Sequence, residues 1–480
     1  MNINRKIIYI AALTALGLTA CGGGGSGDSS SGTGSQANTV TGVITGFGSV
    51  FVDGVKYETD NASFNVDGVS ASEDDLAVGM VVTLTGTVNA DGSTGFANSI
   101  VFEHEVEGVV IANNYLTDQT LDIMGQTIIV DDSTIFESKI AGVTTIDQIA
   151  VDNIVEVSGY PTGNGTIHAT RLEVKKQSKE IDDTLEVKGV VSNLDTSAQT
   201  FTLGSLTVDY STAILDDITN LSDGLYVEVE STQALNGTTL IASEIELEDD
   251  GAMDYSGDDG EEMEFEGIVA SVGDDNSFVV NGQTVHYNNA TEFEYGDLSD
   301  LVVDTKVKVE GEFNADGNLI AEEIKFKMHG ELEVSGLIDS IDTENGTFNM
   351  MGNTFHINNH TIMLDEQDEF VTPERYFNID DLSSNEWVEV HFYQDGDGNL
   401  VATKFERDDY DDSDDDYWSV EGLISAIDTD TDVMVVAGVT VDFSAFPSFN
   451  ANIGTEVEVD GSYNNGMFIA TEIELEEDDD

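Results

Sequence analysis

Short runs in which apolar and polar residues alternate make up most of the chain after residue 37. Alternation of this kind places the apolar side chains on one face and predicts half-buried β-strands. Residues 306–326 (KVKVEGEFNADGNLIAEEIKF) are the clearest case, because two alternating runs flank the pair Asp316-Gly317. Glycine adopts positive φ without a steric penalty and aspartate tolerates it, so this pair predicts the tight turn of a β-hairpin.

The same hairpin closes six successive segments of the chain. An alanine follows each turn glycine by four or five residues, and we predict that it occupies a crowded position where a larger side chain would overpack. A strand with an internal glycine opens each segment, and a short second strand ends in a further turn glycine. The hairpin turn glycines are Gly92, Gly165, Gly237, Gly317, Gly398 and Gly466, and the opening glycines are Gly42, Gly108, Gly189, Gly267, Gly336 and Gly422.

These repeats predict an all-β chain, a tandem array of six small barrels of five or six strands, similar to OB or SH3 barrels, with little helix. Closure into a barrel is favoured because it removes the edge strands of such short sheets. The predicted repeats are residues 38–104, 105–177, 184–248, 263–328, 331–407 and 417–477, with acidic linkers at 249–262 and 408–416. We expect the repeats to form a semi-rigid rod.

The first 37 residues differ in character from the repeats. Arg5 and Lys6 precede an apolar run that ends in Leu-Thr-Ala-Cys at Cys21, which predicts an export signal over residues 1–20. This ending resembles the lipobox of bacterial lipoproteins, which implies that Cys21 carries lipid and that the protein is an outer-membrane lipoprotein of the cell envelope. The alternative is a secretory signal without lipidation. Residues 21–37, rich in glycine and serine, predict a disordered tether.

The net charge of the chain limits the kinds of partner that it can bind. The chain has 16 Lys plus Arg against 95 Asp plus Glu, a net charge of −79. Such a field repels the phosphates of nucleic acids and anionic lipid headgroups, so we expect no nucleic-acid partner and membrane attachment only through the anchor on Cys21. Cations, cationic partners or simple solubility agree with this charge.

One acidic turn matches part of a calcium-binding loop. Asp395, Asp397, Asn399 and Glu406 occupy positions 1, 3, 5 and 12 of such a loop, but Leu400 stands where the loop requires glycine. Because the hairpin turn already explains these residues, they are weak metal candidates, and we predict no resident cofactor. Weak calcium binding by the acidic linkers is the alternative.

Other residues with chemical potential fit structural roles better. His356 and His360 are four residues apart, as zinc ligands on a helix would be, but their surroundings predict a strand. Trp387 and Trp418 are interpreted as core or interdomain packing, with a carbohydrate-stacking platform as the alternative. No catalytic triad or phosphate-binding glycine loop is present in the sequence, so we predict that the protein is not an enzyme.

Taken together, the recurring glycine motifs resemble a bacterial domain of unknown function that is repeated in exported lipoproteins. Residues 75–86 (DLAVGMVVTLTG) match its middle motif best, whereas Ser231 in repeat 3 and Phe392 in repeat 5 stand near the position of its strand-ending glycine. The family implies no activity. We therefore expect a lipid-anchored structural or binding protein that presents its repeats to a protein or glycan partner in the envelope. The alternatives are an acidic module that binds divalent cations, and an envelope enzyme whose site lies between repeats.

Overall fold

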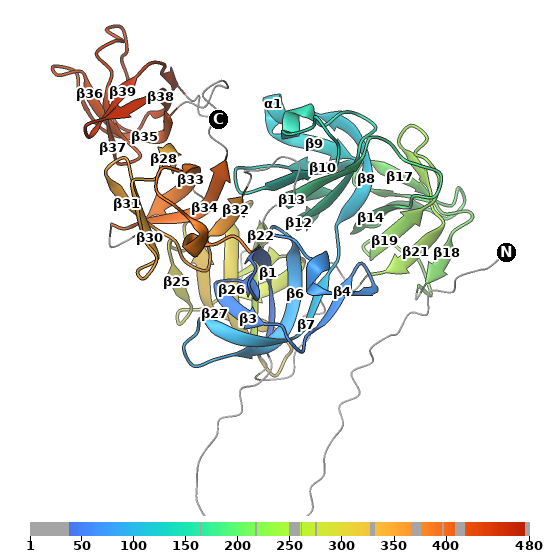
Figure 1. Ribbon diagram of the computed structural model, residues 1–480. Coiled ribbons are helices and arrows are strands. Elements are labelled where there is room, and N and C mark those ends of the chain that lie inside the picture. The colour runs from blue at the N-terminus through green and yellow to red at the C-terminus, as the bar shows by residue number, and fades with distance from the viewer. Residues whose placement is uncertain are drawn as a thin grey trace, which may run out of the picture.

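The computed structural model describes residues 38–163, 165–216, 218–248, 260, 262–273, 276–326, 332–365, 376–395, 398–408 and 418–475. The predicted signal, the tether with Cys21 and most of both acidic linkers lie outside these residues. Within them the chain is almost entirely β-structure, in six tandem repeats, which confirms the predicted fold class (Figure 1).

The first three repeats contain six to eight strands each among the described residues. Repeat 1 comprises β1 (Asn38–Gly46), β2 (Val50–Val52), β3 (Val55–Glu58), β4 (Ser63–Val66), β5 (Val69–Ala71), η1 (Glu73–Asp75), β6 (Val81–Val88) and β7 (Thr94–Phe102). Repeat 2 comprises β8 (Val106–Asn113), α1 (Tyr115–Asp118), β9 (Thr120–Ile123), β10 (Gln126–Ile129), β11 (Ile135–Ser138), η2 (Ile146–Gln148), β12 (Ile154–Gly163) and β13 (Thr166–Lys176). Repeat 3 comprises β14 (Leu185–Val190), β15 (Ser192–Asp195), β16 (Thr200–Leu203), β17 (Leu206–Asp209), β18 (Ile214–Asp216), β19 (Tyr226–Ser231), β20 (Thr239–Ile241) and β21 (Glu244–Leu247).

The last three repeats are built in the same way. Repeat 4 comprises β22 (Glu262–Val272), β23 (Ser277–Val280), β24 (Gln283–His286), β25 (Glu292–Glu294), β26 (Lys306–Phe313) and β27 (Leu319–Phe326). Repeat 5 comprises β28 (Leu332–Leu337), β29 (Ser340–Asp342), β30 (Thr347–Met350), β31 (Asn353–His356), β32 (Ile362–Asp365), η3 (Ile379–Asp381), β33 (Trp387–Gln394) and β34 (Leu400–Asp408). Repeat 6 comprises β35 (Trp418–Asp428), β36 (Val433–Val436), β37 (Val439–Asp442), β38 (Glu456–Asn464), β39 (Met467–Ala470) and β40 (Glu474–Leu475).

A closed ring of five strands is the common unit. In repeat 4 the ring runs β22, β23, β24, β27, β26 and back to β22, with only β24 and β27 parallel. Repeats 1, 2 and 6 close through the equivalent pairs. The additional strands come from the connections, and from opening strands that are divided in repeats 3 and 5. Closure satisfies both edges of each short sheet, as expected for a barrel of this size.

The recurring alanine lies opposite the strand-ending glycine of its hairpin. Gly311 pairs with Ala321 at a β-bulge, and a β-carbon at Gly311 would lie 2.5 Å from the Ile320 carbonyl oxygen. All six alanines are buried, at 0–5% exposure, which confirms the predicted crowding: Ala97, Ala169, Ala242, Ala321, Ala402 and Ala470. In repeat 5 the bulge persists between His391 and Phe392 without a glycine.

Repeat 3 is the exception among the hairpins. The Ser231 hydroxyl, at the position of the strand-ending glycine, donates to the Ile241 carbonyl at 2.7 Å. The returning strand divides there, and β20 pairs with β17 while β21 pairs with β19. The Ser231 hydrogen bond lies at the point where the returning strand divides.

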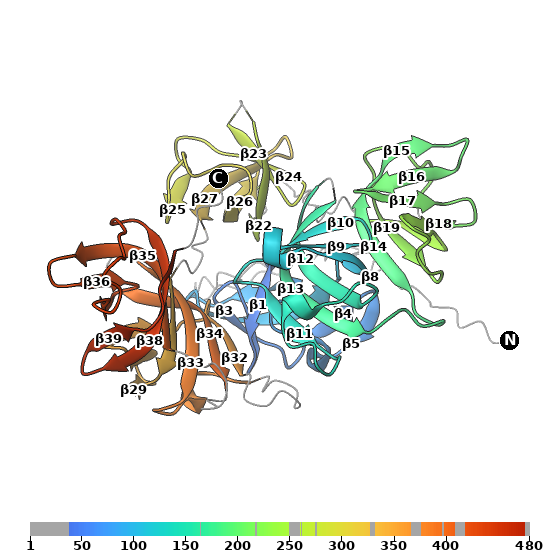
Figure 2. The same cartoon turned by 90° about the horizontal axis from the view of Figure 1, so that it is seen from above.

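The repeats join in pairs that do not follow chain order throughout. β8 and β14 join repeats 2 and 3, and β28 and β35 join repeats 5 and 6, both antiparallel. β1 of repeat 1 pairs in parallel with β22 of repeat 4, with Thr39 opposite Met263. Repeats 3 and 6 lie at opposite ends, with repeats 1 and 4 between them (Figures 1 and 2). The expected rod of sequential repeats is therefore not formed.

The hydrophobic cores follow this pairing. Repeats 2 and 3 share one continuous core, as do repeats 5 and 6, whereas repeats 1 and 4 each keep their own. A small cluster of Val43, Tyr160 and Ile268 connects repeats 1, 2 and 4. No helix in the described part of the chain is long and apolar enough to cross a membrane.

Candidate functional site

A cleft of about 910 Å³ lies between the barrels, lined by residues of repeats 1, 2, 4, 5 and 6; we call it the central cleft. Half of its 32 lining residues are Asp, Glu, Lys or His. Ten carboxylates outnumber four lysines there, and two histidines accompany them. The charged residues are Asp53, Asp131, Asp132, Glu264, Glu266, Glu294, Glu310, Glu333, Glu421 and Glu456, with Lys306, Lys308, Lys325, Lys404, His360 and His391.

Lys308 joins repeats 1 and 4 at one side of the central cleft. It lies on β26, and its ammonium is 2.6 Å from Asp53, 2.6 Å from Glu264 and 2.9 Å from Glu310. Asp53 belongs to the turn between β2 and β3, where its φ of 49° is compatible with a tight turn. Burial and the hydrogen bond with Asp53 raise the pKa of Glu264 to about 8. The positive charge of Lys308 offsets the repulsion between the carboxylates of Asp53 and Glu264, which come from different repeats.

Repeat 5 contributes a row of charged side chains to the opposite part of the wall. Glu333 of β28 pairs directly with His391 of β33, and His391 pairs with Lys404 of β34. The His391 Nε2 atom is 3.2 Å from Glu389, and its Nδ1 atom is 3.8 Å from Glu333. Burial and the nearby carboxylate of Glu389 raise the pKa of Glu333 to about 8.

No sequence motif marks this row, and His391 was not among the predicted site residues. The available signal was the alternation in residues 387–393 (WVEVHFY), which puts Glu389 and His391 on the same outer face of one strand.

The loop after β31 docks repeat 5 onto repeat 1 beside the central cleft. The Asn359 amide donates to the Gly54 carbonyl at 3.0 Å, and the Thr45 hydroxyl donates to the Asn359 carbonyl at 2.9 Å. A β-carbon at Gly54 would collide with the His360 imidazole. His356 lies within β31 and His360 lies in this loop, as the predicted strand context requires, so the two are not on one helical face.

The weak calcium candidates are divided between a turn and a strand. The Asp395 carboxylate accepts from the Asn399 backbone N–H and side-chain amide, both at 2.8 Å, within the hairpin turn. Glu406 lies in β34, roughly 20 Å along the strand from the turn, and contacts Lys404 at 2.7 Å. Asp397 lies outside the described residues. The structure therefore does not bring Glu406 to the turn.

The predicted turn glycines have the backbone conformation that a tight hairpin turn requires. All six have positive φ, in the left-handed region: 63° at Gly237, and between 71° and 88° at Gly92, Gly165, Gly317, Gly398 and Gly466.

The two tryptophans pack between repeats. Trp387 contacts Trp418 edge-on, with ring centroids 5.9 Å apart, and Trp418 stacks on Tyr463 at 6.0 Å. Their place agrees with the interdomain packing inferred from the sequence.

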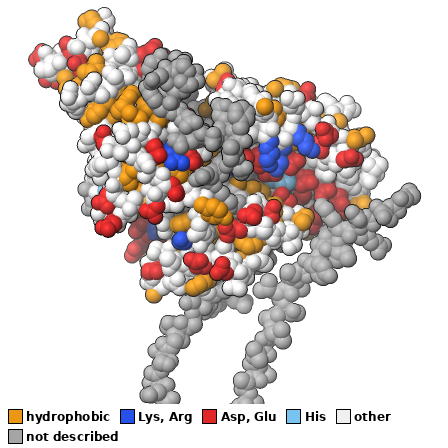
Figure 3. Space-filling model, in the orientation of Figure 1, with side chains coloured by type: hydrophobic (Ala, Val, Ile, Leu, Met, Phe, Trp, Pro, Cys, Tyr) orange, Lys and Arg blue, Asp and Glu red, His pale blue; other side chains and the backbone are white. Residues whose placement is uncertain are grey.

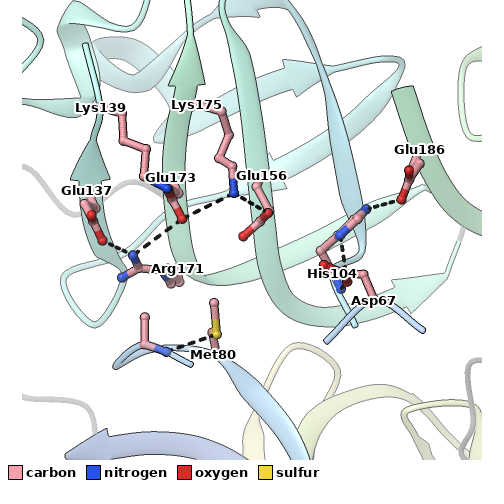
Figure 4. A network of polar contacts seen from close by, with 11 residues as sticks. Asp67, Met80, His104, Glu137, Lys139, Glu156, Arg171, Glu173, Lys175 and Glu186 are labelled. Atoms are coloured by element: carbon pink, nitrogen blue, oxygen red, sulfur yellow. Dashed lines mark hydrogen bonds and ion pairs between the residues drawn. The ribbon is translucent and has the colours of Figure 1, made fainter. Parts of the chain in front are cut away.

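A second polar network holds repeats 1, 2 and 3 together (Figure 4). His104 lies in the short junction between repeats 1 and 2, with Nδ1 2.9 Å from Asp67 and Nε2 3.2 Å from Glu186 of repeat 3. Burial opposes the charged imidazolium, but these two hydrogen bonds raise the pKa of His104 well above its ordinary value. Arg171 of repeat 2 donates to the Val78 carbonyl of repeat 1 at 3.1 Å. Both ring nitrogens of His104 are engaged, so this network is an interdomain contact.

Acidic side chains form several patches on the visible face, and the few Lys and Arg side chains there include one larger group (Figure 3). Among the described residues, two groups place ligand atoms of histidine and carboxylates within 4.8 Å of one another: Asp67, His104 and Glu156, and Glu333, Glu389 and His391. Only the second group has members in the wall of the central cleft.

Comparison with solved structures finds a chain titled "drosophila Unr CSD456", with 16% identity and a TM-score of 0.11. The match covers 46% of this chain and 95% of that chain, and its TM-score is too low to support a fold or a ligand. Comparison with curated proteins finds no match. The family described as "Domain of unknown function (DUF5666)" matches residues 39–100, 107–173, 188–246, 266–325, 335–406 and 421–474. The chain therefore belongs to this family and consists of six tandem copies of its domain.

Proposed function

We propose that this protein is a lipid-anchored binding protein of the bacterial cell envelope, attached to the outer membrane through Cys21, and that the central cleft holds a basic peptide segment of an envelope partner. The observation that carries the proposal is the assembly of one cleft by five repeats, with ten carboxylates in its wall. A volume of about 910 Å³ lies within the range of sites that bind small molecules and short segments.

The charge of the wall favours a cationic ligand over a neutral or anionic one. Lys308 is already surrounded by Asp53, Glu264 and Glu310, so it does not offer a free positive charge. Glu294 and Asp132 are exposed at the wall and come from repeats 4 and 2. Lysine side chains of a bound segment would meet such carboxylates in a partly enclosed space, where ion pairs are screened less than on an open surface.

A pentalysine peptide is a suitable probe, measured by calorimetry on the chain from residue 22 onward at moderate salt. The cleft variant combines Asp132→Lys with Glu294→Lys. The matched control combines Asp182→Lys with Glu344→Lys, which changes the net charge equally at exposed positions outside the cleft. We expect the cleft variant to bind at least tenfold more weakly and the control to bind within about twofold of the original chain, because a close charge pair contributes above 1 kcal/mol and a distant one little. Equal weakening in both variants would mean diffuse attraction by surface charge and would contradict the proposal.

A further inference from the structure

We propose that Glu333, Glu389 and His391 bind a divalent transition-metal ion of the Zn²⁺ type, with an open coordination position toward the central cleft. The three residues come from two adjacent strands, β28 and β33, and their ligand atoms lie within 4.8 Å of one another. The inference concerns the metal alone and does not depend on whether the cleft also binds a basic peptide.

The strand register fixes the geometry of the group. Glu333 and His391 are direct cross-strand partners, and Glu389 precedes His391 by two residues, so all three side chains project from the same face. The Thr403 hydroxyl donates to the His391 carbonyl at 3.1 Å and secures the bulged backbone beside the imidazole. His391 is 6% exposed, so its ring has little freedom to turn away.

One separation already agrees with a small metal ion. Zinc bonds of about 2.0–2.1 Å in tetrahedral geometry place neighbouring ligand atoms about 3.3 Å apart, and the Nε2 atom of His391 is 3.2 Å from the Glu389 carboxylate. The Glu333 carboxylate is 3.8 Å from the other ring nitrogen, Nδ1, but the three ligand atoms lie within 4.8 Å of one another, so a side-chain rotation of Glu333 would complete the site. Zinc accepts both imidazole nitrogen and carboxylate oxygen as ligands, whereas calcium selects oxygen ligands alone, so the imidazole in this group favours zinc.

A fourth carboxylate, from another repeat, also favours a cation at this place. Glu421 of β35 in repeat 6 lies directly opposite Glu333 across the junction of repeats 5 and 6, and both line the central cleft. Like charges in directly opposed positions of a sheet are destabilising. A bound divalent ion would offset this repulsion, and Glu421 is placed to approach the open position.

Lys404 places a positive charge beside the proposed metal site. It pairs with His391 in the register of β33 and β34 and contacts Glu406 at 2.7 Å. Its positive charge next to the site opposes a second cation, so its removal should strengthen metal binding. The other group, around His104, has no such opening, because none of its members lines the central cleft and Lys175 contacts Glu156 at 2.8 Å.

The test is titration of the chain from residue 22 onward with Zn²⁺, and separately with Co²⁺, in excess Mg²⁺ so that weak sites on the acidic surface are occupied. We expect one Zn²⁺ equivalent with an affinity clearly above the background, and ligand-field absorption of a tetrahedral or five-coordinate cobalt ion. His391→Gln should weaken binding at least tenfold and abolish the cobalt spectrum, whereas His356→Gln, in β31 outside the group, should leave both unchanged.

Two further variants keep the test decisive if His391→Gln folds poorly. Glu389→Gln, at a side chain that is 42% exposed, should weaken Zn²⁺ binding with little effect on folding. Lys404→Gln should tighten binding several-fold through the loss of charge repulsion. The proposal is overturned if no single equivalent binds above the background, or if Glu389→Gln and His391→Gln bind Zn²⁺ as tightly as the original chain.

Discussion

Replacement of Lys308 by methionine should loosen the junction between repeats 1 and 4. The ammonium of Lys308 lies among Asp53, Glu264 and Glu310, and the side chains of Lys308 and Asp53 are 9% and 1% exposed. Methionine keeps most of the aliphatic volume but removes the charge. Asp53 and Glu264 would then remain close together, partly buried and without the cation that offsets them.

The expected loss is about 3 to 5 kcal/mol, the usual cost of removing one partner from a buried ion pair. Because about 1.4 kcal/mol corresponds to a factor of ten, the opening equilibrium of the junction should rise by roughly two to four powers of ten. The opening meant here is the separation of β1 from β22. These two strands pair in parallel, with Thr39 opposite Met263.

Hydrogen exchange of the amides in β1 and β22 measures this opening directly. The matched control is Lys325→Met in the same repeat, since Lys325 is 28% exposed and contacts Glu323 at 3.1 Å within its own barrel. The two side chains of this pair are 28% and 20% exposed and belong to one barrel, so its loss should weaken the junction by about 1 kcal/mol at most and change protection less than about fivefold. Unchanged protection in Lys308→Met, or an equal loss in both variants, would refute the reasoning.

The same junction should respond to pH. Burial and the hydrogen bond with Asp53 raise the pKa of Glu264 from 4.5 to about 8, so the folded state holds more protons than the unfolded state in this window. Stability from this group therefore falls as pH rises from about 4.5 to 8. In Lys308→Met the fall should extend to higher pH and be larger in total, because Lys308 lowers the pKa of Glu264, and Glu264→Gln in that background should remove most of it. Exchange rates corrected for intrinsic pH dependence report the difference.

Three further predictions concern other parts of the chain. Cys21→Ser should release the protein from the membrane fraction of the native cell, and continued membrane association would contradict the lipid anchor. His104→Gln should lower the thermal midpoint more at pH 6 than at pH 9, because the raised pKa of His104 gives stability that is fully present below about pH 6.5 and is lost as pH rises through the folded value; an equal loss at both pH values would argue against a charged imidazole. Ala321→Leu should cost about 1–3 kcal/mol by overpacking, measured by denaturant unfolding, whereas Glu322→Leu at the exposed neighbour should cost much less.

The barrel fold was predictable because its determinants are local. Asp316-Gly317 signals a turn, alternation marks the buried face, and an alanine such as Ala321, four or five residues after each turn glycine, indicates a crowded position. Gly317 indeed has φ of 79°, and Ala321 is 1% exposed.

The arrangement of the barrels was not predictable in this way. Alternation identifies the side chains that face the barrel interior, whereas the contacts between repeats use the outward positions. Lys308 and Asp53 are both polar residues on outer faces, and neither sequence position indicates the other as its partner. The sequence around Gly54 signals only a turn, although this glycine also allows His360 of repeat 5 to approach. The central cleft follows from such long-range contacts, so no local motif marks it.

The most direct test of the account is a cross-link between repeats 1 and 4. Thr39→Cys and Met263→Cys place a cysteine pair at opposed positions of β1 and β22, at a strand separation that suits a disulfide. In the chain from residue 22 onward no other cysteine is present. We predict that mild oxidation forms an intramolecular disulfide in nearly all molecules, identified by mass spectrometry of the linked peptides. Free thiols, or disulfides only between separate molecules, would contradict the pairing on which the central cleft depends.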